Sequence, residues 1–280
     1  MGEQAWHEID VEGPLEGLIY EKSEGVATIT LDRPERGNAW HAGMAPAVRA
    51  LWEDVRADPE VRVAIVTGSG ERHFCTGQDV GVAAADGAVA ANRPLEEEVR
   101  WTARQNRVWK PVIAAVNGTV AGGGLHMVVD ADVVVAAENA RFIDTHVNVG
   151  MDGGLENIGL AKRLPLGTAL RMSLQGRDFK LGARRAYELG LVDELVPEGG
   201  ALAAAREIAT SIAANSPQAV ALTQQAIWGS LEMPYREALE HAWALIRLHW
   251  SHPDFVEGPR AFGEGREPRW NPDPDARAEG

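Results

Sequence analysis

The sequence is 280 residues long, which is enough to bury one large hydrophobic core or two smaller ones. Its 27 Lys and Arg residues against 41 Asp and Glu residues leave a formal net charge of -14, which argues against a nucleic-acid partner because such proteins present a basic face. The single cysteine, Cys75, excludes an internal disulfide and a metal site with several cysteine ligands.

The remaining composition is that of an ordinary soluble globular protein, with 45% hydrophobic and 24% charged residues. No apolar run approaches the roughly 20 residues that a membrane-spanning helix needs. The segment 1–12 is polar and acidic, without the basic and then apolar pattern of a signal peptide. We therefore expect a cytoplasmic protein with no membrane partner.

The first third of the chain predicts a hairpin, a helix and a buried strand. Apolar and alternating residues around a Ser-Glu-Gly turn predict the hairpin over 18–31. Apolar side chains at helical spacing predict an amphipathic helix over 42–57. The β-branched run 61–67 predicts a buried strand.

A second strand-turn-helix unit follows. Residues 112–116 predict a buried strand, and the glycines 122–124 open a helix. Two short strands are predicted over 131–137 and 140–143, and the rest of the chain is mostly helical apart from a strand at 191–196. Strands thus alternate with helices before helices dominate, a pattern typical of the α/β class with a helical C-terminal region.

Two loops rich in small residues each lie between a strand and a helix start, at 74–80 and at 117–124. Glycine lets a ligand approach the backbone closely, and backbone N–H groups at the start of a helix favour negative charge. If the loops face each other, one N–H group from each can bind a single carbonyl oxygen, as in an oxyanion hole. The alternative is that each loop is only a turn.

Nucleotide motifs are not favoured by the glycine spacing. A dinucleotide site requires G-x-G-x-x-G at a strand–helix junction, and the stretches 68–70 and 122–124 both lack the third glycine at that spacing. The sequence also contains no G-x-x-x-x-G-K-[ST] phosphate loop. A dinucleotide-dependent oxidoreductase is therefore the weakest of the functional classes considered.

Five segments in chain order carry a resemblance to a known family: 27–39, 74–80, 110–118 with 122–124, 186–193 and 257–262. Together they resemble the crotonase, or enoyl-CoA hydratase/isomerase, superfamily. The resemblance implies a spiral of β-β-α units over 14–200, a helical trimerisation region over 201–266 and a disordered tail over 267–280. It also implies an acyl-CoA thioester substrate, no cofactor apart from that coenzyme A, and a homotrimer or a dimer of trimers.

The resemblance implies an oxyanion hole formed by the backbone N–H groups of Gln78 and Gly123. The 36–39 segment would lie along the pantetheine and phosphate end of coenzyme A, whereas Asp79 is better explained as a helix cap. The positions that match coenzyme A or substrate contacts are Arg36, Gly37, Ala39, Thr76, Asp79, Val80, Gly122, Thr145, Gly153 and Arg266.

The chain departs from the family where related hydratases carry two catalytic glutamates. His126 and His146 occupy these positions, and histidine suits acid–base chemistry because it titrates near neutral pH. Asp152, in an Asp-Gly-Gly loop, is the third candidate; it is either a catalyst or the cap of a helix that starts at 154. The pair His249 and His252 has no third ligand, so no metal site is expected.

The residues leave the reaction open. Hydration, double-bond isomerisation, hydrolysis of a thioester or β-diketone, and C–C bond cleavage all use an enolate that such a hole stabilises. A non-catalytic acyl-CoA binder is the alternative from another class, because the two glutamates are missing. We expect Cys75 to serve packing, and the segments 81–94 and 95–109, the second as a helix, to border the acyl pocket.

Overall fold

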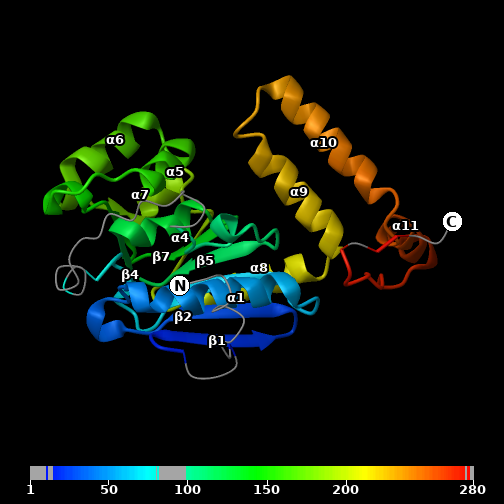
Figure 1. Ribbon diagram of the computed structural model, residues 1–280, viewed down its shortest axis with the longest axis horizontal. Helices are drawn as coiled ribbons and strands as arrows, with labels where there is room; N and C mark the ends of the chain where they lie inside the picture. The colour runs from blue at the N-terminus through cyan, green and yellow to red at the C-terminus, as the bar shows by residue number, and fades with distance from the viewer. Residues whose placement is uncertain (1–10, 12–14, 80, 82–98, 275, 278–280) are drawn as a thin grey trace.

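The larger of two sheets runs through the centre of the protein (Figure 1). The computed structural model describes residues 11, 15–79, 81, 99–274 and 276–277. In spatial order, the strands of the larger sheet are β1 (Leu18–Ser23), β2 (Val26–Leu31), β3 (Val63–Gly68), β5 (Val112–Val116), β7 (Val133–Ala137) and β10 (Glu194–Val196). The smaller sheet contains β4 (His73–Cys75), β6 (Thr119–Ala121), β8 (Arg141–Ile143) and β9 (Leu181–Gly182).

The pairing of the strands confirms the predicted hairpin. β1 and β2 are antiparallel, with Leu18 opposite Leu31 and Ser23 opposite Val26. β2, β3, β5, β7 and β10 then run parallel to one another. Strands of this kind are covered on both faces, which explains why β3 and β5 are buried at every residue.

A repeated step between the sheets produces the spiral. β3, β5 and β7 lie in the larger sheet, and each is followed by a strand of the smaller sheet, β4, β6 or β8. The helices are α1 (Ala45–Ala57), α4 (Leu125–Val129), α5 (Leu155–Arg163), α6 (Leu166–Gln175), α7 (Ala183–Glu188), α8 (Ala201–Ala213), α9 (Pro217–Gly229), α10 (Tyr235–His249) and α11 (Asp254–Glu264). This arrangement confirms the α/β fold class and the β-β-α spiral.

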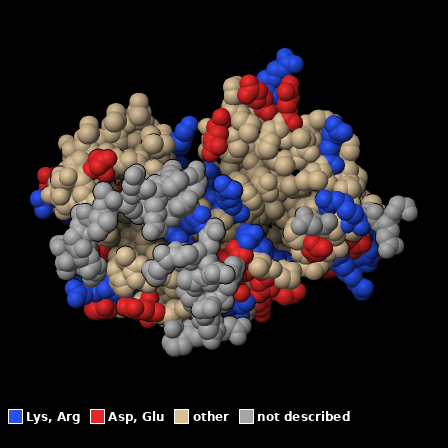
Figure 2. All heavy atoms as spheres, in the orientation of Figure 1, with Lys and Arg blue, Asp and Glu red and all other residues tan. Residues whose placement is uncertain are grey.

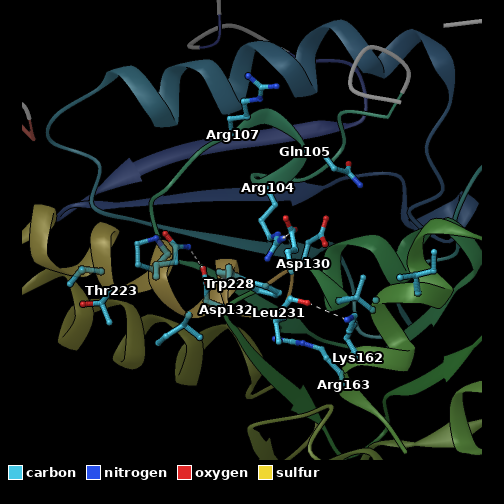
Figure 3. A pocket seen from close by; sticks show the side chains of 18 of the residues that line it. Arg104, Gln105, Arg107, Asp130, Asp132, Lys162, Arg163, Thr223, Trp228 and Leu231 are labelled. Carbon is cyan, nitrogen blue, oxygen red and sulfur yellow. Dashed lines mark hydrogen bonds and ion pairs between the residues drawn. The ribbon is translucent and has the colours of Figure 1, made fainter. Parts of the chain in front are cut away.

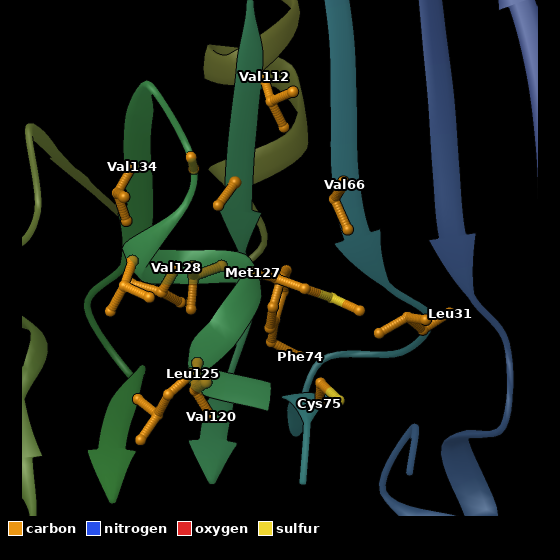
Figure 4. Packing of buried hydrophobic residues seen from close by; sticks show 14 of the residues in the cluster. Leu31, Val66, Phe74, Cys75, Val112, Val120, Leu125, Met127, Val128 and Val134 are labelled. Atoms are coloured by element: carbon orange, nitrogen blue, oxygen red, sulfur yellow. The ribbon is translucent and has the colours of Figure 1, made fainter. Parts of the chain in front are cut away.

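The main core fills the space between the two sheets and the helices around them. Phe74 and Leu125 are fully buried there, and Figure 4 shows them close to Val120 and Val128. A second core lies on the other face of the larger sheet, where α8 packs with Ala201, Ala205 and Ala209. Alanines spaced four residues apart lie on one helix face, and they let α8 approach the strands closely.

The C-terminal helices α9, α10 and α11 extend away from the sheets (Figure 1). Ser216 is the N-cap of α9, and its side chain accepts a hydrogen bond from the amide of Ala219, as the Ser-Pro pair predicts. α10 and α11 leave large apolar side chains exposed, and Figure 2 shows a wide uncharged area over α9 and α10. The most exposed of these side chains are Tyr235, Leu239, Trp243, Ile246 and Phe262.

Residues 267–274, within the segment expected to be disordered, contact the rest of the chain. The indole of Trp270 donates to the carbonyl oxygen of Ala214 at 2.7 Å, and the amide of Asn271 donates to the Asp254 carboxylate at 2.8 Å. Asp254 and His252 are buried polar side chains that need partners, and the tail supplies them. In the described part of the chain, no helix is long and apolar enough to cross a membrane.

Candidate active site

The two small-residue loops meet. The amide of Trp40 donates to the Gly77 carbonyl at 3.0 Å, and the amide of Asp79 donates to the Trp40 carbonyl at 2.7 Å. Because the C=O and N–H groups of one trans peptide point in opposite directions, the Gln78 N–H points away from Trp40. A Cβ atom added to Gly77 would lie 2.8 Å from the nitrogen of Gly123. The backbone amides at 78 and 123 therefore belong to adjoining segments.

Glycines make this contact possible. Gly77 has φ +88° and Gly122 has φ +48°, a region that residues with a Cβ rarely adopt. A Cβ on Gly124 would lie 2.4 Å from the carbonyl oxygen of Cys75. Residues 122–124 form a 3₁₀ turn that leads into α4, and the N–H groups at such a start have no acceptor within the helix.

The 36–39 segment packs against the loop that contains Gln78. The amide of Thr76 donates to the Gly37 carbonyl at 3.0 Å, and Arg33 donates to the carbonyl of Ala39 and pairs with Asp79 at 3.1 Å. Asp79 is thus the partner of a guanidinium group, in addition to any role as a cap. The structure brings four of the expected contact positions together, namely Gly37, Ala39, Thr76 and Asp79.

Other expected contact positions are spread over the molecule. Arg36, the first residue of the 36–39 segment, is exposed at the end of a 3₁₀ turn. Arg266, just beyond α11, is bonded to Glu257 and Glu264, and Figure 1 places α11 at the opposite end of the view from β4. Within one chain, Arg266 therefore does not join the loops. Val80 lies outside the described residues.

The two predicted histidines converge on a carboxylate that the sequence analysis did not select. The Nε2 atom of His126 lies 3.2 Å from Oε2 of Glu156, and the Nε2 atom of His146 lies 3.1 Å from Oε1 of the same residue. Glu156 is on the first turn of α5 and is only 4% exposed. The sequence signal for Glu156 was an acidic residue in the first helical turn after the Asp-Gly-Gly loop. An acidic residue at such a position is more often a surface group that stabilises the start of the helix.

This cluster lies beside the two adjoining loops. A Cβ on Gly122 would lie 3.2 Å from Oγ1 of Thr145 and 3.8 Å from Cε1 of His146. His126 follows Gly123 by three residues and lies on α4. The structure therefore gathers Gly122, Gly123, His126, Thr145 and His146 in one place.

The Asp-Gly-Gly loop leads into α5, but Asp152 is not the cap of this helix. Asp152 is exposed, and α5 has Gly154 as its N-cap without a side-chain bond. Gly153 lies against Asn157, since a Cβ there would be 2.6 Å from the Asn157 amide oxygen. The negative charge of Asp152 nevertheless acts on His146 and favours its protonated form.

The electrostatics of the two histidines differ. A hydrogen bond to Asp144, opposed by burial and reinforced by the charge of Glu156, raises the pKa of His146 above its ordinary value. Burial lowers the pKa of His126, although the charges of Glu156 and Asp130 partly offset it. Burial alone would raise the pKa of Asp144, but hydrogen bonds from His146 and Asn157 leave it below the usual range. The site therefore favours one charged and one neutral imidazole.

Tryptophans enclose the loop side of the cluster. The ring of Trp40 contacts that of Trp101, and the Trp52 indole donates to the Trp101 carbonyl at 2.9 Å. The described residues 99–109 contain only a 3₁₀ turn at Arg104–Asn106, so the helix expected here is wrong for this part. The reason is that side chains such as Gln105 bind the backbone amides in place of helical hydrogen bonds. Residues 82–98 lie outside the described part.

Two further features lie near this site. Cys75 is fully buried, and burial raises the pKa of its thiol to about 12, so packing explains it. A cavity of about 1290 Å³ lies between α4, α5 and α9, where Figure 3 shows Arg104, Lys162 and Trp228. Among the described residues, no cluster of three or more metal-ligating side chains is present.

Comparison with known proteins identifies the class. Residues 21–273 match the enoyl-CoA hydratase/isomerase family. The chain is 35% identical over 256 residues to (E)-benzylidenesuccinyl-CoA hydratase from Thauera aromatica, covering 90% of this chain and 97% of that protein. It is 34% identical over 262 residues to carnitinyl-CoA dehydratase from Escherichia coli K12, covering 91% and 98%.

Solved structures agree. An enoyl-CoA hydratase/isomerase from Mycobacterium paratuberculosis superposes with a TM-score of 0.84 at 36% identity, covering 93% of this chain and all of that one. An enoyl-CoA hydratase from Mycobacterium tuberculosis H37Rv superposes with a TM-score of 0.81 at 32% identity, covering 92% and 99%. The chain therefore belongs to the enoyl-CoA hydratase/isomerase family, within the crotonase superfamily, and is an enzyme of that type.

Proposed function

We propose that this protein binds an acyl-CoA thioester and holds its carbonyl oxygen between the backbone N–H groups of Gln78 and Gly123. The observation that carries this proposal is the contact between the two loops, which places both amides in adjoining segments. Preorganised donors of this kind stabilise the negative charge that develops on the oxygen when an enolate forms. Removal of one such donor typically costs about 10²–10³ in kcat.

The cluster beside the hole handles protons. The Nε2 atoms of His126 and His146 lie 3.2 and 3.1 Å from the Glu156 carboxylate, and the cluster lies next to Gly122 and Gly123. Asp152, exposed on the loop before α5, is the third candidate to reach the acyl group. These groups replace the glutamate pair of related hydratases, and no cofactor other than the coenzyme A of the substrate is required.

Addition or removal of water is the reaction best supported. Two relatives of about one-third identity are named as a hydratase and a dehydratase of acyl-CoA substrates. Isomerisation, hydrolysis of a thioester or β-diketone, and C–C cleavage are the alternatives, because each passes through an enolate or a tetrahedral anion that the same hole stabilises. A non-catalytic acyl-CoA binder is the alternative of another class.

Coenzyme A would lie along the 36–39 segment, with Arg36 as the nearby cation. Because the chain carries a net charge of -14, this local cation and backbone donors must offset repulsion of an anionic ligand. The proposed contacts are completed by Val80, Thr145, Gly153 and Arg266. Arg266 could contact coenzyme A only in the site of a second copy of this chain, since α11, which ends just before it, lies at the opposite end of the view from β4.

Exposed apolar side chains on α10 and α11 support assembly as a homotrimer or a dimer of trimers. The proposed location is the cytoplasm. Trp243 and Phe262 are 53% and 90% exposed on α10 and α11. Contiguous exposed apolar surface of this kind marks interaction sites. Light scattering after size exclusion would give the mass: a trimer or hexamer is expected, and a monomer would contradict this part of the proposal.

The decisive experiment tests the purified protein against a panel of enoyl-, 3-hydroxyacyl- and 3-ketoacyl-CoA thioesters. We expect reversible hydration of an enoyl-CoA and loss of about 10²-fold or more in kcat for Gln78→Pro, which removes one backbone donor. Binding across the panel without any product would favour the non-catalytic binder. Full activity of a folded Gln78→Pro protein would contradict the oxyanion hole.

A further inference from the structure

We propose that Glu156 is the catalytic residue that carries the proton, and that His126 and His146 are positioning residues that hold its carboxylate. This inference rests on the proposed function and reverses the roles that the sequence indicates for the histidines. Its basis is a chain of polar contacts from Gln105 through His126, Glu156 and His146 to Asp144, in which both Nε2 atoms lie within 3.2 Å of the Glu156 carboxylate.

Every imidazole nitrogen of the two histidines already has a protein partner. Nδ1 of His126 lies 3.3 Å from the side-chain nitrogen of Gln105, and Nε2 lies 3.2 Å from Glu156. Nδ1 of His146 lies 2.7 Å from Asp144, and Nε2 lies 3.1 Å from Glu156. A general base must reach the proton that it removes with an available lone pair. In this arrangement neither histidine has one to offer a substrate.

The backbone determines the tautomer of His126. The backbone amides of Trp101 and Thr102 donate to the side-chain oxygen Oε1 of Gln105 at 2.8 and 3.1 Å. The side-chain NH₂ group of Gln105 therefore faces His126. Nδ1 of His126 must therefore accept, and its proton sits on Nε2, which faces the Glu156 carboxylate. Burial, which lowers the pKa of His126, favours this neutral form.

His146 is held in the other protonation state. Both of its nitrogens face carboxylates, so both carry protons, and the hydrogen bond to Asp144 raises its pKa. Asn157 donates to the second oxygen of Asp144 at 2.6 Å and holds it in place. The charged groups that act on the pair are Glu156 on α5, Asp130 after α4, and Asp144 and Asp152 from the segment between β8 and α5.

Glu156 is left as the group with free acceptor capacity. Each carboxylate oxygen has two lone pairs, and each faces one imidazole nitrogen, at 3.2 Å for His126 and 3.1 Å for His146. The charged His146 and the neutral His126 together place one positive charge beside the carboxylate. The carboxylate is thus a base whose position is fixed from two sides.

The proposed step balances for hydration of an enoyl-CoA. Glu156 takes a proton from water, the water oxygen bonds to the β-carbon, and the double-bond electrons move to the thioester oxygen held by Gln78 and Gly123. The enolate then collapses, and its α-carbon takes the proton from the Glu156 carboxylic acid. The carboxylate is restored, and one water has been added; dehydration is the reverse.

The test compares Glu156→Gln with His126→Gln in the full-length protein. Two readouts are measured: hydration of crotonyl-CoA, and exchange of the α-protons of butyryl-CoA in D₂O followed by NMR. For Glu156→Gln we expect both rates to fall by roughly 100-fold or more while butyryl-CoA still binds. For His126→Gln we expect a loss of about tenfold, because the base is retained but less well held. Glu156→Asp should restore part of the exchange.

A pH profile separates positioning from mere stability. The pKa of His146 is raised, so His146→Gln should remove the step in the pH profile of kcat/KM that follows loss of the His146 proton. Equal losses for His126→Gln and Glu156→Gln, or an active Glu156→Gln protein, would overturn the assignment. Wild-type protein that neither binds nor turns over acyl-CoA would instead contradict the proposed function itself. Thermal unfolding of each variant controls for misfolding.

Discussion

The guanidinium of Arg33 lies 3.1 Å from the carboxylate of Asp79, and this ion pair ties the segment after β2 to the residue that follows Gln78. The Arg33 and Asp79 side chains are 16% and 9% exposed, so the pair is largely removed from water. Arg33 also donates to the carbonyl of Ala39. One side chain therefore sets the distance between the two segments that meet at the proposed hole.

Arg33→Met should destabilise the protein and reduce kcat/KM. Breaking a mostly buried ion pair by removing one partner typically costs about 3–5 kcal/mol. Urea unfolding measures this cost. The matched control is Arg56→Met, which breaks the exposed pair with Glu53 and should change stability by less than about 1 kcal/mol. Equal effects of the two variants would contradict a special role for Arg33.

Gly77→Ala should abolish most activity. Its φ of +88° and the backbone atoms at 2.8 and 2.9 Å leave no room for a methyl group, so the two loops must separate. We expect a fall in kcat of roughly 10²-fold, because a misplaced donor no longer reaches the oxyanion. Gly167→Ala in α6, where a Cβ meets nothing within 4 Å, is the control and should stabilise by about 0.5–1 kcal/mol. Normal turnover by Gly77→Ala would argue against the hole.

His126 and His146 should titrate apart when followed by NMR of the ring nitrogens. The pKa of His146 lies above 6.5 and that of His126 below it. Because the native pKa of His146 is raised, its contribution to stability is fully present below the unfolded value of about 6.5. That contribution is lost as pH rises through the native pKa. Coincident titrations would contradict the asymmetry of the cluster.

Unfolding free energies measured against pH check the same point. The difference between wild type and His146→Gln should shrink as pH rises above about 6.5. His126 acts in the opposite direction: its lowered pKa penalises the native state as pH falls below that value. A difference that stays constant with pH would show that His146 is not held in its charged form.

Asp132→Ala should loosen α9. The Asp132 carboxylate accepts hydrogen bonds of 2.7 Å each from the amide of Val112 and from the side chains of Gln224 and Trp228. Removing it leaves these donors without their partner, at about 1–3 kcal/mol for a buried group. Hydrogen exchange in α9 should then accelerate relative to α8. Asp178→Ala, at an exposed position, is the control; unchanged exchange in both would contradict the anchor.

Local patterns predict most of the elements. The strand at 112–116 and the helix over 42–57 follow from runs of β-branched residues and from apolar spacing, which depend on neighbours in sequence. The tail was harder to predict because its order depends on Asp254 and His252, buried groups elsewhere in the chain. The segment 99–109 likewise depends on one side chain, Gln105, that binds backbone amides.

The sequence by itself determined the fold class, the two small-residue loops, and the choice of the two histidines as candidate site residues. Only the tertiary structure decided which group these histidines serve. Glu156 lies ten residues after His146 and thirty after His126, and nothing in its local pattern distinguishes it from a surface residue of a helix. The packing of α5 against α4 buries it between the two imidazoles. A hydrogen-bond partner that comes from a distant element is a property of packing, which sequence spacing does not encode.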